Sequence, residues 1–214
     1  MHSILWTASP SIGLPLLATI GERAGYALAA IAPRRLSSLC AMSVAFQPRF
    51  EFRTPSYEQS RRFWYQFFMC SDIGMNRVAE DSIGFSRFLW ETWSPPGWFT
   101  EEHFKVAARA WGNPDYPAIT LSGYRSRCLK DELRDPAYNQ VQLTLSKSES
   151  IGIPTLMIQG ASDFCDPPGE SEGLEHCFTT SYDRIVLPAV GHFPHREAPS
   201  TVADAILRQL QNGT

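Results

Sequence analysis

Residues 151–168 read IGIPTLMIQGASDFCDPP and residues 187–199 read LPAVGHFPHREAP, and these two stretches decide the fold class. The first has an apolar run, then glycine and Asp163, and the second has an apolar run, then glycine and His192. Short continuous apolar runs are typical of parallel strands buried on both faces. Because the carboxyl ends of such strands line one ligand-binding edge of the sheet, we expect Asp163 and His192 to lie close together.

An aspartate beside a histidine has a defined chemistry. The carboxylate orients the imidazole, fixes its tautomer and stabilises the imidazolium that forms when the ring takes a proton. Taken singly, Asp163 reads as a turn aspartate and His192 as a histidine at the end of a strand. Their order and shared context favour the acid and the base of a catalytic triad, and we predict a hydrogen bond between them.

The rest of the chain has an aliphatic start and an aromatic middle. Eighteen of the 26 aromatic residues fall between Phe46 and Tyr116. Residues 21–33 have alanine and leucine at helical spacing, and residues 36–46 form an apolar run that fits a buried strand. Residues 198–210 have the pattern of an amphipathic helix. Strand, loop and helix therefore alternate as in an α/β protein with a parallel sheet.

Composition argues against several classes of protein. Lysine and arginine total 19 against 22 acidic residues, so no basic surplus can neutralise a nucleic-acid backbone. Five cysteines, an odd number without a CxxC pair, fit a reducing compartment and do not support a zinc site. No apolar run approaches the roughly 18 residues that span a bilayer. We expect a cytoplasmic protein without a nucleic-acid or membrane partner.

Residues 153–210 resemble the closing part of the α/β-hydrolase superfamily, in which the catalytic acid follows the seventh strand and the catalytic histidine follows the eighth, in a GHF..-EAP context. The middle third resembles the helical cap of the epoxide hydrolase and haloalkane dehalogenase branch. PSYEQSRRFWYQFF at 55–68 is similar to its cap helix, and NPDYPAITLSGYRSR at 113–127 is similar to the stretch that supplies a cap tyrosine. The resemblance implies a partial α/β-hydrolase fold with an inserted helical cap.

The resemblance also implies a division of the chain and a reaction. The divergent start with one core helix and strand, the aromatic-rich cap, and the part of the core with the acid and histidine loops are residues 1–45, 46–140 and 141–214. In the implied reaction, His192 activates water and Asp163 orients the histidine. The substrate would be a small apolar epoxide, ester or halide, hydrolysed without a metal or other cofactor.

Three cap residues are predicted to bind the substrate. Cap tyrosines of epoxide hydrolases donate hydrogen bonds to the epoxide oxygen, and by alignment Tyr124 is the first candidate and Tyr65 the second, although Tyr65 could equally just pack. Trp93 is the candidate among four cap tryptophans that could supply a halide donor, most of which fill the cap interior. Gln66 stands where fluoroacetate-type relatives carry a second polar aromatic, so epoxide or ester chemistry is favoured over halide binding.

The nucleophile motif of the branch, GHDWG, is absent from the chain. Alignment of the first helix places Gly21 on the last glycine of that motif and Thr19 in the nucleophile position, where a β-branched side chain fits the strained elbow poorly. Twenty residues cannot hold the five strands that precede the elbow. We therefore expect a chain truncated relative to the family, with three family strands and no resemblance in residues 1–18.

The function predicted is hydrolysis of a small apolar substrate by a nucleophile, His192 and Asp163, with the nucleophile apparently missing. The alternative is a catalytically inactive fragment or a partner-binding remnant. Association with a membrane surface through the apolar start, and formation of a homo-oligomer, also stay open. Because a covalent nucleophile is lacking, we expect hydrolase activity near background.

Overall fold

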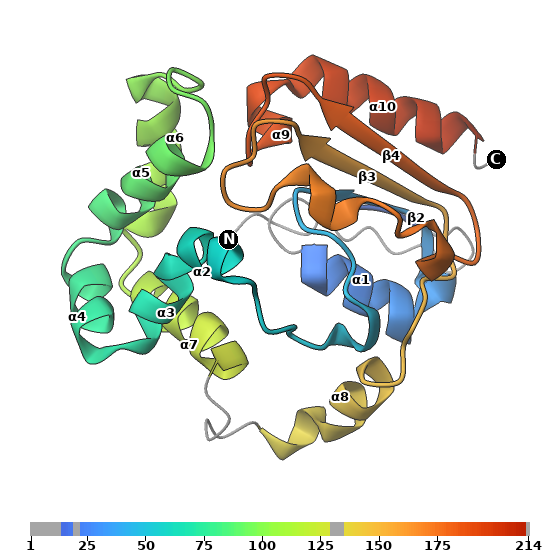
Figure 1. Cartoon of the computed structure of the whole chain (residues 1–214), viewed down its shortest axis with the longest axis horizontal. Coiled ribbons are helices and arrows are strands. Elements are labelled where there is room, and N and C mark those ends of the chain that lie inside the picture. The colour runs from blue at the N-terminus through green and yellow to red at the C-terminus, as the bar shows by residue number, and fades with distance from the viewer. Residues whose placement is uncertain (1–13, 19–21, 129–134, 213–214) are drawn as a thin grey trace. The chain divides into compact units, whose positions relative to one another are not determined.

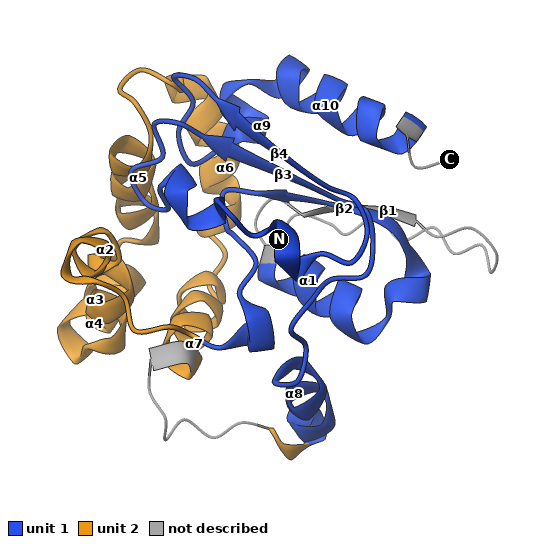
Figure 2. Ribbon diagram, turned by 45° about the vertical axis from the view of Figure 1, so that its right-hand side comes forward, with its two compact units in different colours: residues 1–51, 137–214 blue, residues 52–136 orange. Residues whose placement is uncertain are grey.

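The computed structural model describes residues 14–18, 22–128 and 135–212, which form two compact units (Figure 2). Unit 1 comprises residues 1–51 and 137–214, and unit 2 comprises residues 52–136. The sequence-based boundaries were at 45/46 and 140/141. The difference at the first boundary has a packing reason, since Phe46 is 2% exposed and belongs to the core of unit 1.

Unit 1 is built on a parallel sheet of four strands in the order β1-β2-β3-β4, of which β2, β3 and β4 are labelled in Figure 1. The strands are β1 (Leu14–Ala18), β2 (Leu36–Met42), β3 (Thr155–Gly160) and β4 (Tyr182–Leu187). All six residues of β3 are buried, as its uninterrupted apolar run predicts. The predicted α/β class, with a partial parallel sheet, is confirmed.

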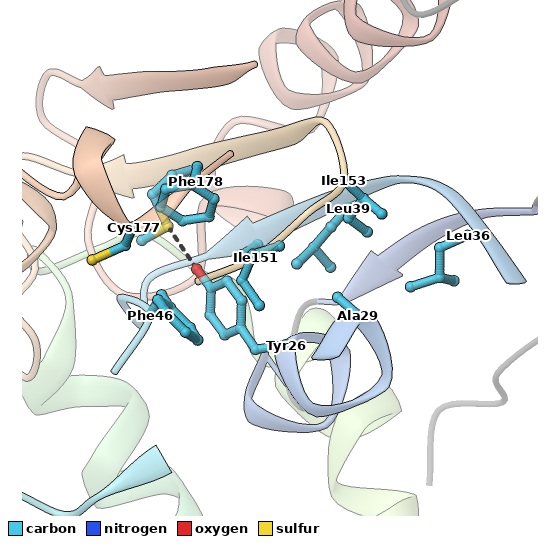
Figure 3. Close-up of a cluster of buried hydrophobic side chains, with 11 residues drawn as sticks. Tyr26, Ala29, Leu36, Leu39, Phe46, Ile151, Ile153, Cys177 and Phe178 are labelled. Carbon is cyan, nitrogen blue, oxygen red and sulfur yellow. Dashed lines mark hydrogen bonds between the residues drawn. The ribbon is translucent and has the colours of Figure 1, made fainter. Parts of the chain in front are cut away.

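Helices cover both faces of this sheet. They are α1 (Glu22–Ile31), α9 (Pro194–Glu197) and α10 (Pro199–Asn212), and α8 (Asn139–Leu145) packs on α1. Alternate residues of a strand point to opposite faces. In β2, Leu39 packs in a cluster with Tyr26 of α1 (Figure 3), whereas Cys40 packs in a second cluster with Val202 of α10. The carboxyl ends of the strands are therefore held on a sheet that is packed from both sides.

Strand β1 corrects the sequence analysis, which predicted three strands and found no family feature in residues 1–18. Its residues pair with β2 in parallel, and the register shifts between Leu14 and Pro15. Pro15 lies within β1 although proline cannot donate a backbone hydrogen bond. A proline is tolerated at the first or last strand of a sheet or at an irregularity, and β1 is first in the described strand order.

Unit 2 is helical, and side chains cap the N-termini of four of its helices. Ser56, Ser71, Asp81 and Thr100 each accept a hydrogen bond from a backbone N–H of the helix that follows. The helices are α2 (Tyr57–Arg62), α3 (Trp64–Cys70), α4 (Asp72–Glu80), α5 (Ser82–Trp93), α6 (Glu101–Trp111) and α7 (Tyr116–Cys128). Aromatic side chains fill its interior, which explains the aromatic composition of the middle third.

Short connections complete the chain. Single 3-10 turns lie at Pro33–Arg35, Pro48–Phe50, Pro136–Tyr138, Pro168–Ser171 and Glu175–Cys177. Within the described part of the chain, none of the helices has the length and apolar character needed to cross a membrane.

Candidate active site

Asp163 lies in the loop that follows β3, and three donors hold its carboxylate. Its Oδ1 atom accepts hydrogen bonds from the backbone N–H groups of Cys165 and Asp166, each at 2.8 Å. Its Oδ2 atom contacts the Nδ1 atom of His192, also at 2.8 Å. The side chain of Asp163 is 0% exposed. A buried carboxylate with this set of donors has a fixed orientation, because each oxygen is already engaged.

His192 lies in the loop that follows β4, and its contact with Asp163 confirms the predicted hydrogen bond. An ionised carboxylate can only accept, so Nδ1 carries the hydrogen and the basic lone pair of the neutral ring is on Nε2. The side chain of His192 is 14% exposed. The arrangement gives an oriented imidazole that can take a proton at Nε2 while the carboxylate stabilises the resulting positive charge.

The two loops approach each other because Gly160 ends β3. A Cβ atom at this position would lie 2.2 Å from the carbonyl oxygens of both Val190 and Gly191, so only glycine fits. The backbone then continues the pairing beyond the strands, since Ser162 N–H donates to the Val190 carbonyl at 2.9 Å. This close approach brings the two ionisable side chains to one edge of the sheet.

Glu197 holds the backbone on both sides of His192. Its Oε2 atom accepts from the N–H of Gly191 at 2.6 Å, and its Oε1 atom accepts from the N–H of Phe193 at 2.9 Å. Sequence analysis gave this glutamate no role. The sequence does mark this glutamate, because it belongs to the family-like segment GHF..-EAP. It stands five residues after the histidine, so its side chain can reach back over the turn of α9.

Asp166 is a second carboxyl group near the pair, and it is more exposed than Asp163. Burial, the largest cause, raises the pKa of Asp166 to about 6. The charges of His192 and Arg23 act to lower this pKa, and those of Asp163 and Glu170 act to raise it. A second histidine near the pair, His195, lies on α9. The carboxylate of Asp163 binds His192.

Replacing Asp166 with asparagine is expected to change how stability depends on pH. The folded chain retains a proton on Asp166 up to about pH 6, whereas an aspartate of ordinary pKa 3.8 loses it earlier. The free energy of unfolding therefore falls as pH rises from about 4 to about 6. Asp166→Asn removes this fall and raises stability at pH 7 by up to about 3 kcal/mol.

Urea unfolding of the full chain at several pH values measures this effect. Asp183→Asn, at an exposed position of β4, is the matched control and is expected to follow the wild-type pH dependence. Parallel curves for Asp166→Asn and the wild type between pH 4 and pH 7 would contradict the prediction.

The three predicted substrate-binding residues lie together within unit 2. The ring of Tyr65 is 4.9 Å from that of Trp93 and 5.5 Å from that of Tyr124, centroid to centroid. Tyr65 is 4% exposed, and its hydroxyl accepts a hydrogen bond from Nε2 of Gln66 at 3.0 Å. Gln66 is 3% exposed and its Oε1 atom has no hydrogen-bond partner among the described residues. Contact of Tyr124, Tyr65 and Trp93 with a substrate stays a prediction.

The candidate nucleophile position, Thr19, and the aligned Gly21 lie outside the described residues. Strand β1 ends at Ala18 and α1 begins at Glu22. The aligned motif thus lies between a strand and a helix, which is the local context that a nucleophile elbow needs.

Known proteins of similar structure were found, although no protein-family model and no curated protein matches the chain. The chain is 31% identical to a candidate epoxide hydrolase from Klebsiella pneumoniae, with a TM-score of 0.79 over 88% of this chain. It is 18% identical to a mutant of an epoxide hydrolase from potato, with a TM-score of 0.65 over 90% of this chain. For a loop variant of a haloalkane dehalogenase from Bradyrhizobium elkanii the identity is 18%, with a TM-score of 0.69 over 93% of this chain.

The chain spans 63% of the Klebsiella protein and 67% of each of the other two. At 18% identity the potato and Bradyrhizobium structures show a shared fold. The Klebsiella structure adds a clear sequence relation over most of this chain. By its partial α/β-hydrolase fold and these neighbours, the chain belongs to the α/β-hydrolase superfamily.

Proposed function

We propose that His192 and Asp163 are the base and the acid of a hydrolase that acts on a small apolar epoxide, ester or carbon–halogen bond. The observation that carries the proposal is the 2.8 Å contact between His192 Nδ1 and Asp163 Oδ2, with Asp163 oriented by two backbone donors. A histidine oriented in this way is suited to activate water. The names of the neighbours, epoxide hydrolase and haloalkane dehalogenase, support the same class of substrate.

In the proposed mechanism, Nε2 of His192 takes a proton from water as the water attacks, and Asp163 stabilises the imidazolium. In a two-step route the water would hydrolyse a covalent intermediate formed by a nucleophile at the strand-to-helix turn. In this chain that position holds Thr19, whose β-branched side chain suits a strained elbow poorly. We therefore expect direct attack by water, and slow turnover.

The proposal extends to the aromatic cluster of unit 2. We assign Tyr124 and Tyr65 as donors of hydrogen bonds to the oxygen that becomes negative when an epoxide or ester reacts, because a phenol stabilises such an oxygen. Trp93, in ring contact with Tyr65, would bind the apolar part of the substrate. Phenylalanine in place of either tyrosine removes the donor and keeps the ring, so it isolates this role.

The test is to assay the purified full chain on a panel of epoxides, activated esters and haloalkanes, beside His192→Ala and Thr19→Ala. Turnover that is lost with His192→Ala and kept with Thr19→Ala is expected. Turnover lost with Thr19→Ala would show that the threonine is a nucleophile after all.

The alternative function is an inactive or partner-binding remnant, and the observation that favours it is threonine at the aligned nucleophile position, Thr19. Absence of turnover on the whole panel, from a chain that unfolds cooperatively, would favour this alternative. Turnover that is unchanged in His192→Ala would contradict the proposed acid–base pair.

A further inference from the structure

A buried amide joins the loop of Asp163 to the end of β2. Gln159, the residue before Gly160 in β3, is 0% exposed. Its Nε2 atom donates to the carbonyl oxygens of Ser43 and Asp166, each at 3.1 Å. Its Oε1 atom accepts a hydrogen bond from the hydroxyl of Ser171. The polar atoms of this buried side chain are thus satisfied, and all their partners lie in loops at the edge of the sheet that carries the candidate site.

Ser43 continues the connection to the loop of His192. Its hydroxyl donates to the carbonyl oxygen of His192 at 2.8 Å. Its own N–H donates to the carbonyl of Ile158 at 3.0 Å, and its carbonyl accepts from Gln159. Ser43 has φ of 68°, in the left-handed region that is unfavourable for a non-glycine residue. Such a conformation persists only where its surroundings hold it, as these three bonds do.

The hydrogen bonds of Gln159 and Ser43 reach both Asp163 and His192 through backbone groups. On one side, the backbone N–H of Asp166 donates to the carboxylate of Asp163, and the backbone carbonyl of Asp166 accepts from Nε2 of Gln159. On the other side, Ser43 holds the carbonyl of His192. Gln159 and Ser43 are themselves hydrogen-bonded, so the two loops are linked by one continuous chain of contacts.

We propose that Gln159 and Ser43 are positioning residues that set the separation of Asp163 and His192. This inference rests on the proposed function, in which Asp163 is the acid and His192 is the base. The contacts join residues 116 and 149 positions apart in the sequence, so they fix the loops against each other and not only within themselves. A hydrogen bond to a charged group weakens steeply with distance and angle, so a small displacement of either loop weakens the bond between the pair.

The test separates positioning from simple support of the fold. Ser43→Ala removes the hydroxyl and keeps the strain of the left-handed backbone, whereas Ser43→Gly removes the hydroxyl and relieves that strain. Ala189→Gly is the matched control, because Ala189 also has a left-handed backbone, with φ of 58°, and the substitution removes no side-chain hydrogen bond. Gln159→Met keeps the approximate side-chain volume and removes the bonds to Ser43 and to the Asp163 loop.

The readout is NMR of the His192 ring in the full chain, which needs no turnover. In Ser43→Ala, Ser43→Gly and Gln159→Met we expect the downfield Nδ1–H signal to move upfield or broaden. We expect the midpoint of the ring titration to fall by roughly half a pH unit, a threefold change, because the bond to Asp163 stabilises the charged ring. Ala189→Gly is expected to leave both unchanged.

Two results would overturn the inference. One is an unchanged His192 signal and midpoint in Ser43→Gly or in Gln159→Met. The other is a shift in Ser43→Ala that Ser43→Gly restores, because the shift would then follow backbone strain and not the hydroxyl. Failure of the proposed function gives a different result. Hydrolysis would then be absent or independent of His192, while the His192 signal would still respond to the Ser43 and Gln159 substitutions.

Discussion

Asp163→Asn is expected to abolish any hydrolysis above background that depends on His192, because the same change in a complete serine protease triad lowers kcat by about 10⁴-fold. Asparagine keeps the shape of the side chain, and its carbonyl oxygen can still accept from the backbone N–H groups of Cys165 and Asp166. Its amide then faces Nδ1 of His192 as a donor. The ring must adopt the other tautomer, which removes the lone pair from Nε2.

Steady-state assay of the most reactive substrate of the panel measures this effect, with Asp183→Asn as an exposed aspartate control that should retain wild-type turnover. The free energy of unfolding of each variant is compared in the same buffer, so that a loss of folded protein is not mistaken for a loss of chemistry. A loss of less than tenfold in folded Asp163→Asn would show that the carboxylate does not orient the base.

Trp90→Ala is expected to lower the free energy of unfolding of unit 2 by about 3–5 kcal/mol, since it removes a large side chain from an aromatic core. Trp90 is 5% exposed. Its ring lies 4.7–5.5 Å, centroid to centroid, from those of Trp98, Phe99, Phe104 and Trp111. The close-packed rings around this position can fill the resulting cavity only in part.

Guanidinium unfolding of the full chain, followed by near-ultraviolet circular dichroism, reports this loss. Phe67→Ala is the matched control, because Phe67 lies on α3 and is 44% exposed, and it should cost less than about 1 kcal/mol. Equal destabilisation by the two variants would show that Trp90 is not central to the packing of unit 2.

The contact between Asp163 and His192 could be predicted because it follows from local patterns and one topological rule. Asp163 comes three residues after, and His192 directly after, a glycine that follows an apolar run, and parallel strands bring such loops to one edge of the sheet. The roles of Ser43 and Gln159 could not be predicted in this way. The hydrogen bonds of Ser43 with Gln159 and with His192 join residues more than 100 positions apart in the sequence, and nothing in the pattern SVAF or MIQG marks a long-range hydrogen bond.

Secondary structure was predictable where periodicity was strong. Helix α1 and strand β2 lie within residues 21–33 and 36–46, as predicted, whereas β1 was not predicted. Residues 114–124 gave no clear pattern, and α7 includes most of them. Both failures have one cause, since tertiary packing decides a segment whose own sequence preference is weak.

The most direct test of the central claim is a nitrogen-15 NMR spectrum of His192 in the folded full chain, assigned by comparison with His192→Ala. The account predicts a neutral ring with hydrogen on Nδ1 at high pH, and on protonation a downfield Nδ1–H signal that disappears in Asp163→Asn. A neutral ring with hydrogen on Nε2, or a ring signal that Asp163→Asn does not change, would contradict the assignment of an oriented base in this chain.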